Sequence, residues 1–523
     1  MRSSDIDVVV VGYGYAGAAA ALSAASSGAR VLLLEKAATP GGISICSGGG
    51  VRAATDEDNA FAYLKATCAG KTPDPILRRL AEGMVRMRET LTGFARVNGA
   101  VVAQRVYPGN YPLPGTGSLG SMFIESIPNF DPAVSYPHVR GSAENGALLF
   151  KVMEDNVSAN TDKIEVVTNC AARRLRRTDS GALQLELAGG TTVAPRGGII
   201  LACGGFEADA ELQAQYWPGG PALPCGYRHN TGDGLRMAQA LGAGLWHMWH
   251  YHGSYGYRLP DPSYPYGIRV KSLPNWWSID NPHIPKMVWI LLDCYGRRFM
   301  NEYEPYGQDT GHRPLAHFDP ATQSYPRKPS YLVTNEAGRL LYPLGRPIRN
   351  DPEVSYEWSR DNSREIASGL FRKAATVEEL ASLIDADPQV VANSIDRWNS
   401  ACANGLDPEF GRPPNSMHPL REPPFYVAEV HQIVSNTQGG PLRDEEQRVL
   451  DAFGDPIPGL YVAGECSSAF GHLYLGSGNV TECFVSGEIA GRNAARFRWE
   501  DKVEQVGSAF SRLRARERSR ATW

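Results

Sequence analysis

The first hydrophobic block of the chain is almost all valine and runs from Asp7 to Val11, directly before a glycine-rich turn. An alanine-rich stretch, Ala18 to Ser27, comes next, and a second apolar block follows from Arg30 to Leu34. Short apolar runs bounded by glycine predict buried strands, and the alanine-rich stretch predicts a helix between them. The order strand, glycine turn, helix and strand is typical of a nucleotide-binding α/β unit.

Later apolar blocks predict further strands of the same sheet. Gly198 to Leu201 leads into the segment Cys203-Gly204-Gly205-Phe206, and Gly459 to Val462 leads into Ala463-Gly464-Glu465. Strands that end in glycine turns are expected to lie in one parallel sheet with ligand contacts at its carboxyl edge. The sheet is therefore predicted to combine strands from both ends of the chain.

The middle of the chain has a different composition. From about Trp246 to Glu422 it is rich in Trp, Tyr, His and Pro, which favours a separate domain with long loops. Pro423 and Pro424 mark the return to the first domain. The prediction is an α/β fold, with a Rossmann-type domain and its parallel sheet from residues 1–245 and 423–523 and an inserted α+β cap domain from residues 246–422.

Composition excludes several classes of protein. With 523 residues, 42% of them apolar, the chain can bury a large core, and its net charge of -4 argues against a nucleic-acid partner. The nine cysteines form no CxxC pair and no metal-type cluster, so reduced thiols and no metal site are expected. The eleven histidines show no metal-ligand spacing either.

The two ends of the chain need separate interpretation. Arg2 followed by an apolar stretch could be a secretory signal, but Asp5 and Asp7 interrupt it and a nucleotide-binding turn explains the glycines better. No run of about 18 apolar residues occurs, so no membrane span is predicted and a cytoplasmic location is expected. The arginine-rich end is expected to be a solvated helix, and its arginines are Arg512, Arg514, Arg516, Arg518 and Arg520.

Gly12, Gly14 and Gly17 form a GxGxxG pattern between the first predicted strand and helix. The first glycine permits the tight turn, the second lets the backbone approach a pyrophosphate, and the third allows close packing of helix and strand. The helix N-terminus then faces the phosphates with unpaired N–H groups. Glu35 ends the second strand, where an acid accepts hydrogen bonds from ribose and repels a 2′-phosphate, so NADP is disfavoured.

NAD-binding and FAD-binding proteins share this fingerprint, and the distant strand and turn at Gly459–Glu465 favours FAD. Here the sequence resembles the FAD-dependent oxidoreductases of the fumarate reductase and 3-ketosteroid dehydrogenase superfamily. The segments Leu201–Phe206 and Thr231–Gly234 also match motifs of that superfamily. The resemblance covers nearly the whole chain and implies one FAD. It is expected to be noncovalent, because residues 41–49 contain no histidine. The cofactor-binding residues that this implies are Gly12, Gly14, Ala16, Gly17, Glu35, Lys36, Gly41, Gly42, Ser44, Ser47, Gly48, Gly49, Ala172, Ala202, Gly204, Asp233, Gly464, Glu465, Asn479 and Val480.

Two motifs bear on the reaction. Residues 296–302 resemble the superfamily's Gly-Arg-Arg-Phe-x-Asn-Glu segment, and Tyr306 stands where fumarate reductases carry a proton-donating arginine. Tyr474 stands where they carry a carboxylate-binding arginine, and Asn436 replaces their histidine. Both tyrosine positions instead match 3-ketosteroid dehydrogenases, although Leu475 replaces the proline that is usual there.

This resemblance implies a role for each residue. Desaturation of a ketone removes a proton from the α-carbon and a hydride from the β-carbon, and Tyr306 is the expected base. A phenol has a pKa of about 10, so donors that stabilise negative charge on the ketone oxygen are also needed. The Tyr474 hydroxyl and the Gly478 backbone N–H are the predicted donors, and Tyr111 is a candidate third tyrosine.

Other residues have alternative interpretations. Ser477 could join the hydrogen-bond network or cap the following helix, and Arg140 could anchor an acidic substrate or serve the fold. Aromatic residues of the cap could line an apolar pocket or pack in the core; they are Trp246, Trp249, Tyr251, Tyr255, Trp276 and Trp277.

The leading hypothesis is an FAD-dependent dehydrogenase that introduces a C=C bond next to the carbonyl of a cyclic ketone, either a steroid or a smaller ring. Its expected partners are that ketone and an external electron acceptor. One alternative is an enone or fumarate-type reductase that runs the reverse reaction. Another is an electron-transfer flavoprotein subunit without substrate chemistry of its own.

Overall fold

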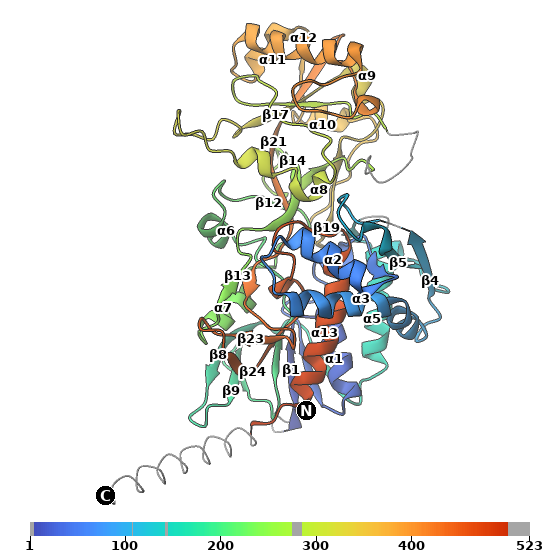
Figure 1. Cartoon of the computed structure of the whole chain (residues 1–523), viewed down its shortest axis with the longest axis vertical. Helices are drawn as coiled ribbons and strands as arrows, with labels where there is room; N and C mark the ends of the chain where they lie inside the picture. The colour runs from blue at the N-terminus through green and yellow to red at the C-terminus, as the bar shows by residue number, and fades with distance from the viewer. Residues whose placement is uncertain (1–4, 107, 142–144, 275–284, 500–523) are drawn as a thin grey trace, which may run out of the picture.

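The computed structural model describes residues 5–106, 108–141, 145–274 and 285–499. A lower part contains β1, α1 and α13, and an upper part carries α11 and α12 (Figure 1). The predicted basic helix at the chain end and the pair Trp276 and Trp277 lie outside the described residues. The mixed α/β fold with a parallel sheet and a cap confirms the predicted fold class.

The predicted nucleotide-binding unit forms β1 (Val8–Val11), α1 (Tyr15–Ser26) and β2 (Val31–Leu34). β1 pairs in parallel with β2 and with β11 (Ile199–Leu201), which pairs in parallel with β24 (Pro456–Val462). The prediction of one parallel sheet from both ends of the chain is therefore confirmed. Two further strands extend it, β7 (Ile164–Val167) in parallel beside β2 and β23 (Arg448–Leu450) antiparallel beside β24.

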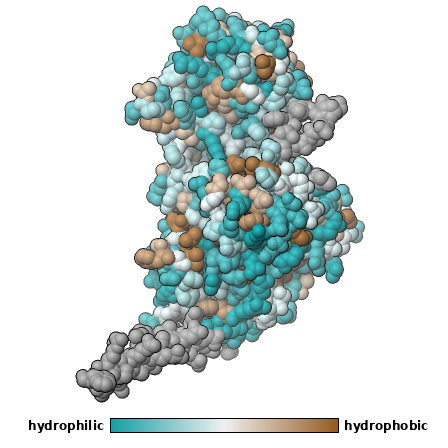
Figure 2. Space-filling model, in the orientation of Figure 1, coloured by the Kyte–Doolittle hydropathy of each residue, from teal (hydrophilic) through white to brown (hydrophobic). Residues whose placement is uncertain are grey.

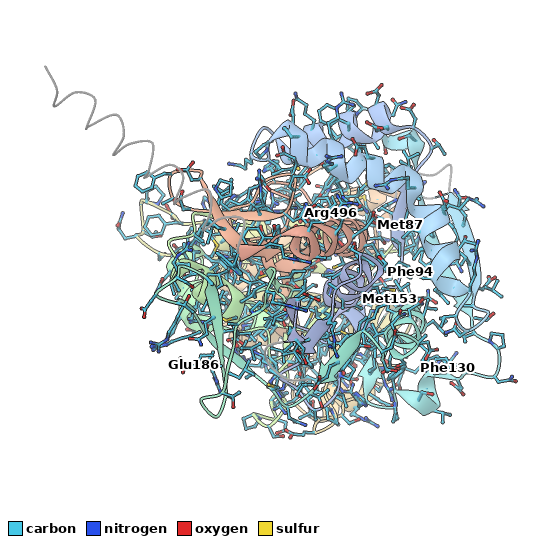
Figure 3. The ribbon with its side chains drawn as sticks, turned by 90° about the horizontal axis from the view of Figure 1, so that it is seen from below. Met87, Phe94, Phe130, Met153, Glu186 and Arg496 are labelled. Atoms are coloured by element: carbon cyan, nitrogen blue, oxygen red, sulfur yellow. The ribbon has the colours of Figure 1, made fainter. Side chains whose placement is uncertain are left out.

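Small residues hold the two ends of the chain together. Helix α13 (Gly478–Arg496) lies beside the alanine-rich α1 (Figure 1). A Cβ atom on Gly487 would lie 2.8 Å from the carbonyl oxygen of Ala16, so glycine permits this close approach. Phe94 of α3 (Asp74–Ala95) packs against Phe484 of α13, with ring centroids 6.0 Å apart, and Met87 of α3 belongs to the same core; both α3 residues are labelled in the view from below (Figure 3).

The upper part is built on a mixed sheet that includes the longest strand, β21 (Phe425–Thr437). Although β21 follows residue 422, it pairs with β14 and β17 of the predicted cap segment, so the cap sheet continues beyond that position. The other strands of this sheet are β12 (Leu223–Pro224), β14 (Tyr251–Arg258), β15 (Gly267–Val270), β16 (Ile290–Leu292), β17 (Ser330–Asn335), β18 (Gly345–Arg346) and β20 (Arg372–Ala374).

Smaller sheets and helices complete the described chain. The remaining strands are β3 (Val51–Ala54), β4 (Val101–Val106), β5 (Leu119–Ser126), β6 (Val139–Arg140), β8 (Ala172–Arg177), β9 (Leu183–Leu187), β10 (Thr192–Val193), β13 (Leu245–Trp246), β19 (Arg349–Asn350) and β22 (Gly440–Pro441). The remaining α-helices are α2 (Glu57–Cys68), α4 (Pro132–Ser135), α5 (Asn145–Ser158), α6 (Ala210–Tyr216), α7 (Asp233–Gln239), α8 (Gly307–Thr310), α9 (Glu336–Arg339), α10 (Ser363–Ala367), α11 (Val377–Leu383) and α12 (Pro388–Asn404).

The visible surface is largely hydrophilic, with apolar residues scattered singly or in small groups (Figure 2). Among the helices of the described ranges, none combines the length and apolar character that a membrane crossing requires. All nine cysteines are free thiols in the structure.

Candidate active site

A cavity of about 420 Å³ reaches from the glycine turn after β1 to the cap sheet. This volume lies within the range of about 300 to 1,000 Å³ that is usual for small-molecule sites. Every predicted cofactor-binding residue except Gly17 and Gly464 lines it. Those lining residues are Gly12, Gly14, Ala16, Glu35, Lys36, Gly41, Gly42, Ser44, Ser47, Gly48, Gly49, Ala172, Ala202, Gly204, Asp233, Glu465, Asn479 and Val480.

Gly17 and Gly464 lie behind the cavity wall, where space is too small for a side chain. A Cβ atom on Gly17 would lie 1.8 Å from the carbonyl oxygen of Gly12, and one on Gly464 would lie 2.7 Å from the Cβ atom of Ala16. Both contacts are shorter than van der Waals packing permits. Gly17 therefore shapes the turn from behind, as the third position of a GxGxxG pattern requires. Gly464 permits the close approach of Ala16.

The carboxylate of Glu35 is held in place at the end of β2. Its Oε2 accepts the backbone N–H of Tyr13 at 3.0 Å, and its Oε1 accepts that of Ala37 at 2.8 Å. Burial raises the pKa of Glu35, and these two hydrogen bonds oppose the shift. Since each carboxylate oxygen keeps a further acceptor site, the group can also accept ribose hydroxyls. A glycine turn at a helix N-terminus and an acid beyond it are the residues that a dinucleotide such as FAD requires, so the cavity fits that cofactor.

The same cavity contains both predicted reaction tyrosines. Tyr306 precedes α8, and Tyr474 precedes α13; both are buried, and both line the cavity. A Cβ atom placed on Gly476 would lie 2.7 Å from the Tyr306 hydroxyl oxygen, so this hydroxyl touches the loop that carries Tyr474. The ring of His252 connects them, with ring centroids 4.1 Å from Tyr474 and 6.3 Å from Tyr306.

The surroundings of Tyr474 affect its hydroxyl. Burial raises the pKa of Tyr474, and the backbone N–H groups of Asn479 and Ser477 at the start of α13 oppose the shift. The hydroxyl therefore keeps its proton at neutral pH. A protonated phenol at a helix N-terminus is suited to donate a hydrogen bond to an oxygen that gains negative charge.

Asp309 organises this wall from behind. Its Oδ2 accepts the Tyr111 hydroxyl at 2.7 Å and the Tyr474 backbone N–H at 2.8 Å, while Oδ1 lies 3.3 Å from Nε2 of His250. Burial alone would raise the pKa of Asp309, but the hydrogen bond with His250 and the charge of Arg313 lower it overall. The carboxylate is therefore ionised. Tyr111 does not line the cavity, because its hydroxyl points to this carboxylate.

The structure bears on two residues at the start of α13, the predicted donor Gly478 and the neighbouring Ser477. The Gly478 N–H donates to the carbonyl of Leu475 at 2.6 Å, and Gly478 is not among the residues that line the cavity. Ser477 does line it, and its side chain makes no capping hydrogen bond to α13. Its φ of 66° places it in the left-handed region, so the backbone turns sharply at the cavity wall.

The cap aromatics and Arg140 lie away from the cavity. None of the described candidates lines it: Trp246 and Tyr251 are packed in the core, and Trp249 is 40% exposed. Tyr255 accepts a hydrogen bond from Trp289 at 3.0 Å. Arg140 donates to the carbonyl oxygens of Pro137 and Val139 instead of facing the cavity.

Several cavity residues were not predicted. They come from loops and cap strands that carry no local motif, so only their approach in the fold reveals them; these residues are Asn110, His252, Arg269, Gln308 and Arg346. Burial lowers the pKa of His252 to about 3, with the charge of Arg269 acting in the same direction, so its imidazole is neutral. Its Nδ1 lies 3.1 Å from Oδ1 of Asn436.

The cavity, its glycine turn and its acid define a dinucleotide-binding protein. A family model described as FAD binding domain matches residues 7–481, and the chain belongs to that family. It is an FAD-dependent oxidoreductase of the kind that includes fumarate reductases and ketosteroid dehydrogenases, and its homologues act on carbon-carbon bonds.

Individual relatives are similar over most of their length. A digoxin reductase from Eggerthella lenta is 28% identical, covering 95% of this chain and 88% of that protein. A 4-oxocyclohexanecarboxylate 2-dehydrogenase from Sinomonas cyclohexanicum is 25% identical, covering 94% and 93%. The crystal structure of a 3-ketosteroid delta1-dehydrogenase from Sterolibacterium denitrificans has the same fold, with a TM-score of 0.76 at 20% identity over 94% of this chain and 99% of that one.

Proposed function

We propose that this protein is an FAD-dependent dehydrogenase that introduces a C=C bond between the α- and β-carbons of a cyclic ketone. The observation that carries the proposal is the meeting of Tyr306 and the Tyr474 loop in the cavity that the glycine turn also lines. Relatives named for a single-ring ketone and for a 3-oxosteroid support the substrate class.

Each tyrosine then has one task. Tyr474 donates its hydroxyl proton as a hydrogen bond to the ketone oxygen, which makes the α-proton more acidic. Tyr306, in its phenolate form, takes that proton as general base and becomes the neutral phenol. When bound, FAD supplies the two-electron chemistry by accepting the hydride of the β-carbon. Continued turnover requires an external electron acceptor.

The remaining residues position these groups. Asp309 holds the backbone of Tyr474 at 2.8 Å, and Tyr111 holds Asp309, so we assign Tyr111 a positioning role. The Gly478 N–H is bonded to Leu475, so a second hydrogen bond to the ketone oxygen requires that turn to open. The N–H groups of Ser477 and Asn479 lie nearer the Tyr474 hydroxyl and stabilise it as charge develops.

The test is anaerobic mixing of the FAD-loaded protein with saturated cyclic ketones, followed by flavin absorbance. The wild-type protein is expected to lose its oxidised flavin absorbance, and Tyr306→Phe to slow this by about 10² to 10⁴ with an unchanged flavin spectrum. Tyr295→Phe, at an exposed tyrosine, is the matched control. Full activity in Tyr306→Phe would refute the base assignment.

The reverse reaction is the second candidate, because buried Tyr474 keeps its proton and a related protein is named a reductase. A reductase would oxidise reduced flavin on mixing with an unsaturated ketone, but would not bleach oxidised flavin with the saturated one.

We also propose that FAD is held noncovalently. The loop of residues 41–49 has no histidine, and its Cys46 thiol is buried and donates to the Ile43 carbonyl at 3.3 Å. Acid precipitation should therefore release all flavin into the supernatant, whereas flavin that stays with the protein would show a covalent link.

A further inference from the structure

Two arginines face each other on the cap side of the cavity. Arg269 of β15 and Arg346 of β18 are directly paired positions of neighbouring antiparallel strands. Side chains of such a pair lie on the same face of a sheet with their Cβ atoms about 5 Å apart, and like charges there destabilise the fold. Both residues line the cavity that contains Tyr306 and Tyr474.

The Arg269 guanidinium has few polar contacts among the described residues. Its side chain is buried, with 6% relative exposure, and Nη2 donates to Oε1 of Gln308 at 2.8 Å. Its Nε atom is buried without a hydrogen-bond acceptor, and no carboxylate of the described residues forms an ion pair with it. A buried charge in this state costs free energy unless a ligand compensates it.

Other buried arginines of the described chain have partners. Arg298 and Arg412 share the carboxylate of Glu302, and Arg443 pairs with Glu482 at 2.8 Å. Arg349 instead donates to the carbonyls of Val354 and Tyr356 and to a serine hydroxyl. Among the described residues Arg269 has one hydrogen-bond acceptor and no carboxylate, and it lines the cavity.

The positive charge at this wall is concentrated. Burial lowers the pKa of Arg346 to about 10, and the charge of Arg269 acts in the same direction. Nearby Cys225 is a neutral thiol, since burial raises its pKa. An anion bound between the guanidinium groups would relieve both the repulsion and the unmet hydrogen-bond donor.

The position of the pair identifies the source of that anion. The FAD phosphates belong at the glycine turn of Gly12 and Gly14, beside α1. Arg269 instead contacts Gln308, which follows Tyr306 by two positions, so the pair lies where the substrate must approach the tyrosines.

We propose that Arg269 and Arg346 form a subsite for a carboxylate on the substrate, which makes the natural substrate a cyclic ketone that also bears an acid group. This inference rests on the proposed function. The carboxylate is held by the cap, while the ketone and its α-carbon meet Tyr474 and Tyr306.

The test compares binding and flavin reduction for cyclohexanones that carry a carboxylate at ring position 3 or 4 and for their methyl esters. With the FAD-loaded wild-type protein, at least one acid should bind about 10 to 100 times more tightly than its ester, measured from the flavin difference spectrum. In Arg269→Met and Arg346→Met this preference should largely vanish. Arg140→Met, at an arginine outside the cavity, should keep it.

Two outcomes would overturn the subsite: equal binding of acids and esters by the wild-type protein, or an unchanged preference in both cap variants. Arg269→Gln is a second variant should Arg269→Met lose its flavin. The proposed function is judged separately. Tight acid binding without flavin reduction would refute the proposed dehydrogenase activity and support the subsite. Equal flavin reduction by acid and ester would support the dehydrogenase activity and refute the subsite.

Discussion

The hydroxyl of Tyr111 donates a 2.7 Å hydrogen bond to Oδ2 of Asp309. The same oxygen accepts the backbone N–H of Tyr474, so one ionised carboxylate links the loop before β5 to the loop that carries a reaction tyrosine. Resemblance alone suggested Tyr111 as a third group at the substrate. The hydrogen bond supports a role in positioning.

Tyr111→Phe should lower stability more than it lowers activity. A hydrogen bond to a charged group contributes about 1.5 to 3 kcal/mol, and its loss leaves a lone pair of a buried carboxylate unmet. Urea unfolding of the FAD-loaded protein should show that decrease, while the rate of flavin reduction falls less than tenfold and Tyr295→Phe changes neither. Unchanged stability with a hundredfold slower reaction would instead place the Tyr111 hydroxyl at the substrate.

Tyr474→Phe should slow flavin reduction by about 10² to 10³, the usual effect of removing one donor to a developing oxyanion. The ring stays packed against His252, so the fold and FAD content should persist. The expected signature is a loss in the rate constant with little change in ketone binding, because the hydrogen bond strengthens as charge develops. Weaker ketone binding at an unchanged rate constant would show that the hydroxyl contributes to ketone binding but not to the rate of flavin reduction.

Glu304 is one source of the pH dependence of stability. Burial raises the pKa of Glu304 to about 7, with Asp309 adding to the shift and Thr310 and Arg313 opposing it. In the unfolded chain the pKa is about 4.3, so between these values the folded state holds a proton that the unfolded state has lost. The free energy of unfolding therefore falls by about 3 kcal/mol as pH rises from 4.3 to 7, and this contribution is constant above.

Glu304→Gln should remove that decrease. The measured quantity is the difference in unfolding free energy between variant and wild type at pH 5 and pH 8, since other groups titrate equally in both. The difference should favour the variant at pH 8 relative to pH 5, and Glu422→Gln, at an exposed position, should show no such trend. A pH-independent difference for Glu304→Gln would show that the carboxyl is ionised throughout.

Local patterns predicted the cofactor half well, because the glycine turn, α1 and β2 are contiguous in sequence and each follows from short-range rules. The residues of the substrate wall were harder to predict from the sequence. Tyr306 and Tyr474 were found through motif resemblance, whereas Arg269 and Arg346 meet only through the pairing of β15 with β18, which no periodicity encodes. The double proline at 423 and 424 indicated a domain boundary, yet β21 begins at once and pairs back into the cap sheet.

Gly476 offers the sharpest test of the wall between the tyrosines. A Cβ atom there would lie 2.7 Å from the Tyr306 hydroxyl and 2.9 Å from Oδ1 of Asn110, closer than real side chains approach. Gly476→Ala should therefore displace Tyr306 and slow flavin reduction at least tenfold, while FAD binding at the glycine turn is retained. Gly93→Ala is the matched control, because nothing lies within 4 Å of its Cβ position in α3, and it should leave the rate unchanged. Wild-type rates in Gly476→Ala with full FAD content would mean that the Tyr306 hydroxyl is not held at this loop during the reaction, and the base assignment would lose its structural support.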